Sequence, residues 1–242
     1  MKCEGRRPFA YNAQAVVDQK QGIVVAADIT VQETDNYELV PMAEQAWQNT
    51  GTSSPVLTVA DGGYGNGAQV AEAARRQLKV LVQPQDGGSH KAAGYSARDF
   101  QYDAAAGTVT CPQNQQLDYG GEARQKDQQV KRFWCHVKDC PVARLCKDSK
   151  GRRVVEIWGH TAAVQQMRQN LKGREAREAL SKRGQIIERH FGHIKQHDGF
   201  RRWTVRGTEN VRTQWALINL TTNLRLLHKL WSRQIQQKQH LN

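Results

Sequence analysis

The sequence predicts a mixed α/β fold, and three observations lead to this prediction. Two β-rich runs, residues 11–18 (YNAQAVVD) and 22–30 (GIVVAADIT), flank a short turn-like stretch, which is typical of a β-hairpin. From there to residue 85, helix-like and strand-like segments alternate, as in a sheet flanked by helices. Helical periodicity then returns from about residue 174.

The segments that follow the hairpin predict the order helix, strand, helix, strand. Asp35 is predicted to cap the first helix and Gly51 to end it. The apolar residues of this helix share one face: Leu39, Met42, Ala43 and Ala46. The runs VLTVAD (56–61) and VLVQP (80–84) predict short strands on either side of a helix.

Residues 86–173 differ in composition, because Gly, Gln and Ser are frequent and strong periodicity is missing. Only TVTCPQNQQLDY (108–119) predicts a small hairpin there. We therefore expect a basic, Cys-containing insertion that is poorly ordered or held together by a metal. It would divide an α/β core made of residues 9–85 and 174–232, and a polar, frayed tail would follow at 233–242.

Two long helices are predicted in the C-terminal part. In GQIIERHFGHIK, an apolar stripe runs through Ile187, Phe191 and Ile194, and Glu188 lies at its edge. In residues 209–231, the stripe passes through Val211, Trp215, Ile218, Leu220, Leu224, Leu227 and Trp231. Both tryptophans are expected in the core, whereas His190 and His193 are expected at the surface.

Composition favours a cytoplasmic protein without a membrane partner. No apolar run approaches the roughly 20 residues of a membrane helix, and the opening MKCEGRRPFA lacks the apolar centre of a signal peptide. Five cysteines are an odd count, which suits a reducing compartment better than a disulfide framework.

The net charge of +12 is concentrated in the second half of the chain. Residues 1–123 hold 9 Lys/Arg and 14 Asp/Glu, a net charge of −5, whereas residues 124–242 hold 26 and 9, a net charge of +17. A half-chain this basic predicts a surface that binds a polyanion such as nucleic acid.

Two acidic residues are candidates for metal chemistry. Asp61 ends a predicted strand, where ligands bind in open α/β sheets. Glu188 lies on a basic helix, and a phosphodiester site with two Mg²⁺ ions needs carboxylates from separate elements. Lys195 would lie on nearly the same helix face and hold a phosphate. In the alternative interpretation, Asp61 caps the following helix and Glu188 pairs with Arg or Lys; spacing alone leaves both open.

Four segments in order, YNAQAVVD, GIVVAADIT, ADGGYGNGAQV and RGQIIERHFGHIKQHDGFRRWTVRG, resemble insertion-sequence transposases of the DDE superfamily. In that family the second catalytic aspartate lies in an A-D-x-G-Y motif, matched here by residues 60–64. The third acid lies in a helix motif R-x(3–4)-E-x2-F-G-x-I-K, matched from Arg183 through Glu188 to Lys195. The resemblance covers most of residues 9–85 and 180–230.

The resemblance implies an RNase H-like mixed sheet and the chemistry of DNA transposition, with Asp61 and Glu188 as catalytic ligands of Mg²⁺ (or Mn²⁺). Arg183 and Lys195 would steer phosphates. The implied partners are DNA at the element ends and target DNA, and the active full-length form would be a homo-oligomer associated with the bacterial nucleoid.

One departure from the family concerns its first catalytic aspartate, which lies on a strand before the counterpart of YNAQAVVD. No aspartate precedes Tyr11 here, and the nearest candidates, Asp18 and Asp28, do not match the family position. We therefore expect a C-terminal portion of a transposase, with a sheet incomplete at its N-terminus and uncertain enzymatic activity. The alternative function is a non-catalytic DNA-binding remnant that competes with full-length transposase.

Four of the five cysteines fall in the insertion: Cys111, Cys135, Cys140 and Cys146. Cys135-x4-Cys140 is at the long end of common zinc spacing, and Cys140-x5-Cys146 lies beyond it. A structural Zn²⁺ bound by the four thiolates would order a segment poor in apolar residues. Free, reduced thiols are the alternative, and Cys3 is expected to be a free thiol.

Basic residues beside aromatic ones provide the candidate DNA contacts. Arg201, Arg202 and Arg206 surround Trp203, and such clusters hold phosphates while an aromatic ring stacks on a base. For Trp203, stacking on DNA and packing against the Glu188 helix are both open.

Overall fold

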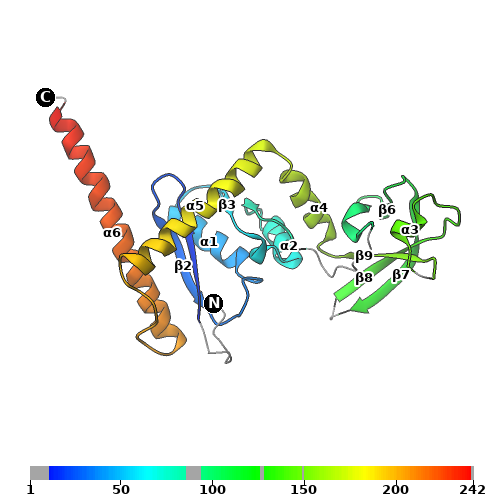
Figure 1. Cartoon of the computed structure of the whole chain (residues 1–242), viewed down its shortest axis with the longest axis horizontal. Coiled ribbons are helices and arrows are strands. Elements are labelled where there is room, and N and C mark those ends of the chain that lie inside the picture. The colour runs from blue at the N-terminus through cyan, green and yellow to red at the C-terminus, as the bar shows by residue number, and fades with distance from the viewer. Residues whose placement is uncertain (1–10, 86–93, 126–127, 149, 241–242) are drawn as a thin grey trace.

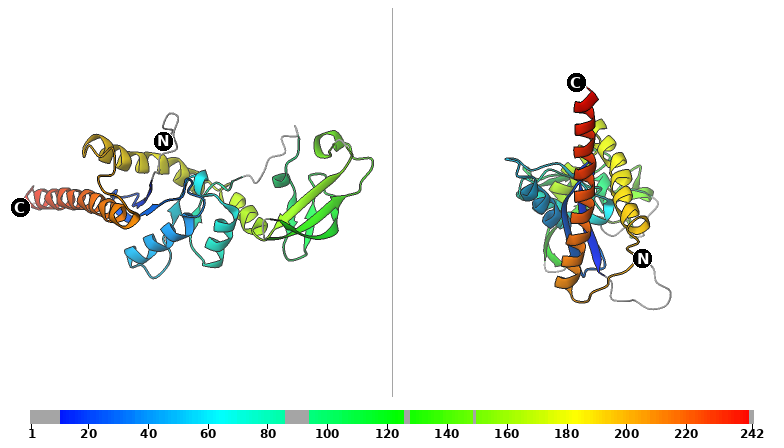
Figure 2. Two further views of the ribbon diagram at one scale, coloured as in Figure 1. Left: turned by 90° about the horizontal axis from the view of Figure 1, so that it is seen from below. Right: turned by 90° about the vertical axis from the view of Figure 1, so that its left-hand side faces the viewer.

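The computed structural model describes residues 11–85, 94–125, 128–148 and 150–240; Cys3 lies outside these ranges. Within them the chain forms a mixed α/β structure with six α-helices and nine strands. An α/β body carries a separate antiparallel sheet at one end and the long helix α6 at the other (Figures 1 and 2). None of the described helices is long and apolar enough to cross a membrane.

Two small sheets lie in the body, and no ladder joins them within the described residues. β1 (Asn12–Val17) and β2 (Val24–Thr30) pair antiparallel, which confirms the predicted hairpin. β3 (Thr58–Val59) and β4 (Val80–Leu81) pair in parallel, as expected for strands connected through a helix.

The first core forms between helices α1 (Leu39–Thr50), α2 (Gly67–Arg75) and α4 (Thr161–Asn170). The predicted apolar face of α1 is confirmed, because all four of its residues are buried. The predicted cap is wrong: the N-cap is Glu38, which makes no side-chain cap bond, and Asp35 accepts hydrogen bonds from β1 instead.

Helix α4 lies inside the segment that the sequence assigned to an insertion. Its Val164 and Met167 nevertheless pack into the same core as Leu39 of α1 and Val70 of α2. The domain limits at residues 86 and 173 remain a prediction. Because α4 packs with α1 and α2, a revised second limit would lie before α4.

Helices α5 (Arg174–Gln196) and α6 (Thr208–His240) complete the body. α5 packs against β1 and β3, and α6 packs against β2. A second core joins Ile29, Ile194, Val211 and Trp215. Trp215 is only 2% exposed, which confirms its predicted core position, and its Nε1–H donates to the Gln14 carbonyl oxygen at 2.9 Å.

The second half of α6 departs from the prediction. Residues 233–240 continue the helix, so they are not a frayed tail. The stripe predicted to continue inward faces away from the body, and its members are at least half exposed: Leu220, Leu224, Leu227 and Trp231. The predicted stripe joins two faces of the helix, because Leu220 follows Ile218 by only two residues. Val211 and Trp215 lie on the face of α6 that packs against the body and β2, and the second apolar stripe lies on the opposite face.

The segment expected to be poorly ordered forms a five-stranded antiparallel sheet. Its strands follow in sequence order: β5 (Gln101–Asp103), β6 (Thr108–Thr110), β7 (Gln116–Gln125), β8 (Gln128–Cys135) and β9 (Arg153–Trp158). The predicted hairpin at 108–119 is confirmed, since Val109 lies opposite Leu117. Phe100, Phe133 and Val155 join them in a core of its own.

The periodicity of this sheet is hard to read because its strands are short or irregular. The β7–β8 ladder is interrupted between Tyr119 and Glu122, where Gly121 has a φ of 100°. A Cβ on Gly120 would stand 2.0 Å from the Trp134 ring, so glycine is required where this ring crosses β7.

His190 is 5% exposed, so its predicted surface position is wrong. Its ring lies 5.3 Å from the Phe191 ring and 6.2 Å from the Trp215 ring, measured between centroids. Both ring nitrogens lack a hydrogen-bond partner, as does Oδ1 of the buried Asn219. Burial lowers the pKa of His190; the nearby Asn219 side chain opposes this shift, and the neighbouring His193 adds to it, so the neutral form is favoured in the folded state.

We expect His190 to make folding less stable in mild acid. As pH falls below the ordinary pKa of 6.5, the unfolded chain takes up a proton that the folded chain does not, so stability is complete above 6.5 and declines below it. Urea unfolding above and below this pH should show a larger loss of stability for the wild type than for His190→Phe. Equal losses in the two proteins would contradict the assignment.

Candidate active site

Asp61 lies two residues after the end of β3, and its side chain faces α5. Its Oδ1 accepts a hydrogen bond from Gly63 N at 2.8 Å and thereby caps the 3-10 turn η1 (Gly62–Tyr64). The helix that was expected to follow Asp61, α2, is capped by Asn66 instead. Gly65 holds the turn against the chain after β4, because Gln85 N donates to its carbonyl oxygen at 2.8 Å. A Cβ on Gly65 would stand 2.0 Å from the Gln83 carbonyl oxygen.

The second contact of Asp61 is an ion pair with Arg183 of α5. Arg183 Nη1 lies 3.4 Å from Asp61 Oδ2, and the two side chains are 30% and 46% exposed. The two residues are 122 positions apart in the sequence. This pair therefore brings the strand-end motif and the helix motif together in space.

A further carboxylate, Asp35, lies beside Asp61, and the sequence did not identify it as a site residue. Its Oδ1 accepts hydrogen bonds from Asn12 Nδ2 at 2.7 Å and Gln14 Nε2 at 2.8 Å. A Cβ placed on Gly63 would stand 2.9 Å from Asp61 Oδ1 and 3.3 Å from Asp35 Oδ2, so both carboxylates border one small volume. In the sequence, the signal for a carboxylate at this place is the pair of amide residues on one face of β1, Asn12 and Gln14.

Tyr64 completes this arrangement of polar groups. Its hydroxyl donates a hydrogen bond to Gln14 Oε1, and the Gln14 side chain is 1% exposed. Burial raises the pKa of Tyr64, and the negative charges of Asp35, Asp61 and Glu38 raise it further. The phenol therefore stays protonated and acts as a hydrogen-bond donor at the edge of an acidic cluster.

The two aspartates nearest to the family's first acid in sequence are engaged elsewhere. Asp18 Oδ2 accepts from Gln21 N at 2.6 Å in the β1–β2 turn. Asp28 Oδ1 accepts from Arg212 Nε of α6 at 2.6 Å. Neither side chain is joined to Asp61 by a hydrogen bond in the part of the chain that the structure describes.

Glu188 is exposed on α5, five residues after Arg183. Its Oε1 lies 3.8 Å from the position of a Cβ on Gly184, so the carboxylate points back along the helix toward the level of Arg183. Over the described ranges, no hydrogen bond or ion pair links Glu188 to Asp61 or to a basic residue. A shared pocket for Asp61 and Glu188 stays a prediction.

The acidic cluster suits a hard cation in part. Carboxylate oxygens are the donors that Mg²⁺ and Mn²⁺ prefer, and Asp35 and Asp61 supply two that are close together. As the side chains lie, no three His, Cys, Asp or Glu residues of the described segments form a group able to hold a metal. The two neighbouring aspartates are therefore a partial ligand set.

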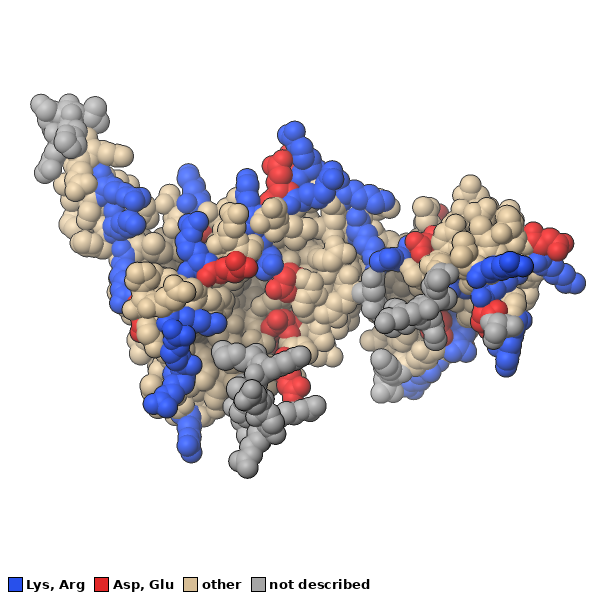
Figure 3. Space-filling view, viewed as in Figure 1, with Lys and Arg blue, Asp and Glu red and all other residues tan. Residues whose placement is uncertain are grey.

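Basic side chains flank the acidic cluster. Figure 3 shows Lys and Arg along α5 and over the α5–α6 connection, with acidic side chains between them in the middle of the body. The predicted DNA contacts Lys195, Arg201, Arg202 and Arg206 are exposed, whereas Arg183 is occupied by its ion pair with Asp61.

Trp203 packs within the protein rather than standing free. Its ring centroid lies 5.0 Å from that of Phe200, 6.1 Å from that of Trp215 and 6.3 Å from that of Tyr11. These contacts favour the packing interpretation of Trp203 and leave DNA contact to the arginines beside it.

Residues 110–228 match a sequence family described as a transposase DDE domain, a range that includes Glu188 and the four insertion cysteines but not Asp61. No curated protein and no solved structure matched the chain, so the RNase H-like fold stays a prediction. Over residues 110–228, the chain is therefore similar to a transposase DDE domain.

Proposed function

We propose that this protein acts in DNA transposition as a DDE-type transposase core whose acidic site is incomplete. The observation that carries this proposal is the ion pair between Arg183 and Asp61. It joins the A-D-x-G-Y motif to the helix that holds Glu188, and that helix lies inside the region matched to the transposase DDE domain. The strand-end motif and the helix motif, each too short to identify a family alone, thus lie side by side in the structure.

Asp61, Glu188 and Asp35 would hold the divalent ion. Bound Mg²⁺ or Mn²⁺ would supply Lewis-acid stabilisation of the charge that develops on phosphodiester oxygens. Arg183 neutralises Asp61 while the site is without substrate, and its guanidinium is the group best placed to turn to a DNA phosphate. Lys195 would hold the backbone further along α5.

Only Asp61 and Glu188 correspond to acids of the family, so the set is one carboxylate short of the family's three. Asp35 lies beside Asp61, but its Oδ1 already accepts two hydrogen bonds from β1, which makes it a weaker ligand. Acidic ligands act as a unit, so an incomplete set binds metal weakly and loses nearly all activity. A chain in this state would bind DNA without cutting it.

We expect the purified chain to show no strand transfer with Mg²⁺ or Mn²⁺ and to bind Mn²⁺ weakly. Asp61→Asn and Asp35→Asn should each weaken Mn²⁺ binding, because each removes one charged oxygen ligand. Asp18→Asn, which alters a carboxylate in the β1–β2 turn, is the matched control and should bind as the wild type does. Efficient joining of DNA ends by the chain alone would refute the incomplete-site proposal.

The DNA surface proposed here is the α5–α6 connection with Arg201, Arg202 and Arg206. These side chains are exposed and need no burial of charge to reach phosphates. They follow directly after the helix that carries Glu188, so DNA bound to them would lie next to the acidic cluster.

Replacing Arg201, Arg202 and Arg206 by Ala should weaken binding to duplex DNA of any sequence. The dependence of log Kd on log salt concentration should flatten by about 1 for each lost phosphate contact. Fluorescence anisotropy over a salt series measures both effects. Lys20→Ala with Lys79→Ala removes exposed charge elsewhere and should change neither quantity; an equal effect of this control would show that only net charge matters.

A homo-oligomeric working form is also proposed, and the exposed face of α6 supports it. Leu217, Leu220, Leu224, Leu227 and Trp231 are spaced alternately by three and four residues, and each is at least 50% exposed. This spacing is the one with which two helices pack together in a coiled coil. A second copy of α6 would cover the stripe.

Sedimentation velocity should detect self-association that Leu224→Glu with Leu227→Glu lowers at least tenfold in apparent affinity. Two charges in the centre of an apolar helix contact cannot be buried without a large desolvation cost. Val31→Glu places a charge at an apolar residue that is 61% exposed outside α6 and serves as the control. A monomeric wild type at all accessible concentrations would contradict the helix pairing.

A second candidate function is a non-catalytic DNA-binding protein that competes with a complete transposase. The incomplete set of acidic ligands favours this second function, because DNA binding does not require a bound metal ion. DNA binding without strand transfer in the assays above is the result expected for this form, whereas metal-dependent joining of DNA ends would exclude it.

A further inference from the structure

The five-stranded sheet brings four cysteines to one end, and we propose that Cys111, Cys135, Cys140 and Cys146 bind one structural Zn²⁺ ion. This proposal does not depend on the acidic cluster around Asp61. It rests on strand geometry, hydrogen bonding to sulfur and local charge, which are taken in turn.

Strand direction places the first two thiols together. Cys111 directly follows β6, and Cys135 is the last residue of β8. Both strands pair antiparallel with β7, so they run parallel to one another and end at the same edge of the sheet. Both cysteines pack against the core that contains Phe133.

The loop after β8 returns the other two thiols to this edge. Cys146 ends the short helix α3 (Ala143–Cys146) and packs against the same core. Its carbonyl oxygen accepts from Arg153 Nη1 at 3.4 Å, and Arg153 lies opposite Cys135 in the β8–β9 ladder. Cys140 begins the turn into α3, where its carbonyl oxygen accepts from Ala143 N at 3.0 Å.

The backbone around Cys111 directs two amide groups at its sulfur. Its Sγ accepts hydrogen bonds from Gln113 N at 3.3 Å and Gln115 N at 3.4 Å. Asn114 between them has a positive φ of 56°, which turns both amides toward the sulfur. Outer hydrogen bonds of this kind orient a side chain that binds a metal.

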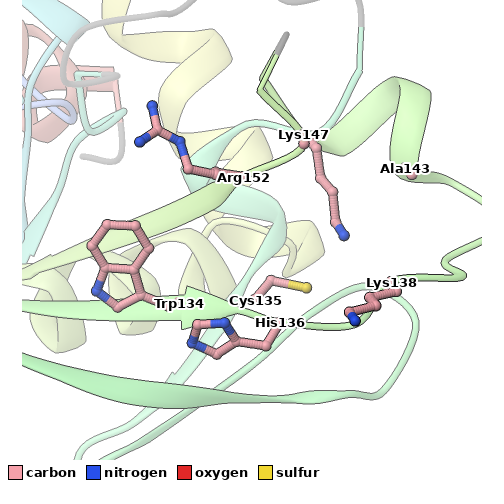
Figure 4. A pocket seen from close by; sticks show the side chains of 8 residues that line it. Trp134, Cys135, His136, Lys138, Ala143, Lys147 and Arg152 are labelled. Carbon is pink, nitrogen blue, oxygen red and sulfur yellow. The ribbon is translucent and has the colours of Figure 1, made fainter.

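Positive charge surrounds the same edge. A hollow of about 510 Å³ there is lined by Cys135 together with Lys138, Lys147 and Arg152. Figure 4 shows the Cys135 sulfur on the side of the hollow where both lysine ammonium groups lie. Lys147 Nζ also donates to the Val137 carbonyl oxygen, which ties the chain after Cys146 to the loop that carries Cys140. Four thiolates around Zn²⁺ leave a net charge of −2, which Lys138 and Lys147 would offset, whereas Arg152 already pairs with Asp148 at 3.4 Å.

All four thiols are free and half-buried. As the side chains stand, no three of the described His, Cys, Asp or Glu residues form a ready metal site. Binding therefore requires the thiols to rotate inward toward a common centre, and the loops of four and five residues between the last three cysteines permit this.

The sheet has a physical need for such a ligand. Its core contains six buried apolar residues, Phe100, Val109, Leu117, Phe133, Val155 and Ile157. So few rarely stabilise an independent unit, and small units of this kind commonly rely on a structural metal. A tetrahedral set of four sulfur ligands selects zinc or an iron–sulfur centre, and the oxygen ligands preferred by Mg²⁺ are missing from it.

The test uses the whole chain, purified under reducing conditions, stripped with a chelator and reloaded with Zn²⁺. Metal analysis should find one zinc per chain. Titration with Co²⁺ should give the ligand-field bands of a tetrahedral ion and a thiolate charge-transfer band whose intensity corresponds to four sulfur ligands. Zinc should raise the unfolding temperature, since the metal binds only the folded sheet.

Variants assign the ligands. Cys111→Ser and Cys140→Ser should weaken zinc binding by more than the ~10–100-fold that follows loss of an outer-shell partner, whereas Cys140→His, which retains a ligand atom, should recover much of it. Cys3→Ser is the matched control and should bind zinc as the wild type does. Should a Ser variant fail to fold, the intensity of the wild-type cobalt charge-transfer band still counts the thiolates. Sub-stoichiometric zinc, bound iron, or unchanged affinity in the folded Ser variants would overturn the proposal.

Discussion

Gln14 is the residue on which the arrangement of the body depends. Its backbone carbonyl oxygen accepts from Trp215 Nε1 of α6, its side-chain oxygen accepts from the Tyr64 hydroxyl, and its side-chain amide donates to Asp35. The side chain is almost fully buried, so an unpaired amide there would cost about 1–3 kcal/mol. Because β1 and β3 share no ladder in the described structure, these side-chain bonds replace backbone pairing as the link between the two small sheets.

The same constraint shapes the electrostatics of the candidate site. Asp35 is fixed by two amides from β1, and Asp61 is fixed by its own turn and by Arg183. Two carboxylates held close together repel one another, and a partly buried guanidinium relieves that repulsion in the absence of another cation. The acidic cluster is thus organised before any ligand arrives, and the surrounding arginines of α5 and the α5–α6 connection provide the field that would attract a polyanion.

Local patterns were enough to predict the elements of the body but not the contacts between them. The β1–β2 hairpin and the apolar face of α1 follow from periodicity, which the structure confirms. The role of Asp35 depends on a contact with β1, which is distant in the sequence. The local sequence around Asp35 predicted a helix cap because it contains no information about that contact. Trp231 was expected in the core but is exposed, and His190 was expected at the surface but is buried. Periodicity predicts which residues of a helix share a face, but the neighbouring elements decide which face is covered. The first part of the five-stranded sheet escaped prediction because β5 and β6 have only three residues each and the β7–β8 ladder is interrupted. The alternation of the buried Val155 and Ile157 in β9 was a readable strand signal that the prediction missed.

The length of α6 has a practical consequence. Its 33 residues extend roughly 50 Å, and its C-terminal half leaves the body on the side opposite the five-stranded sheet (Figures 1 and 2). A fluorophore or a surface tether attached near Gln237 would therefore stand clear of both the aspartates and the cysteines. Immobilised in this way, the protein would offer its acidic cluster and its thiols to solution at the same time, so single-molecule tests for DNA capture and metal uptake could be made on one preparation.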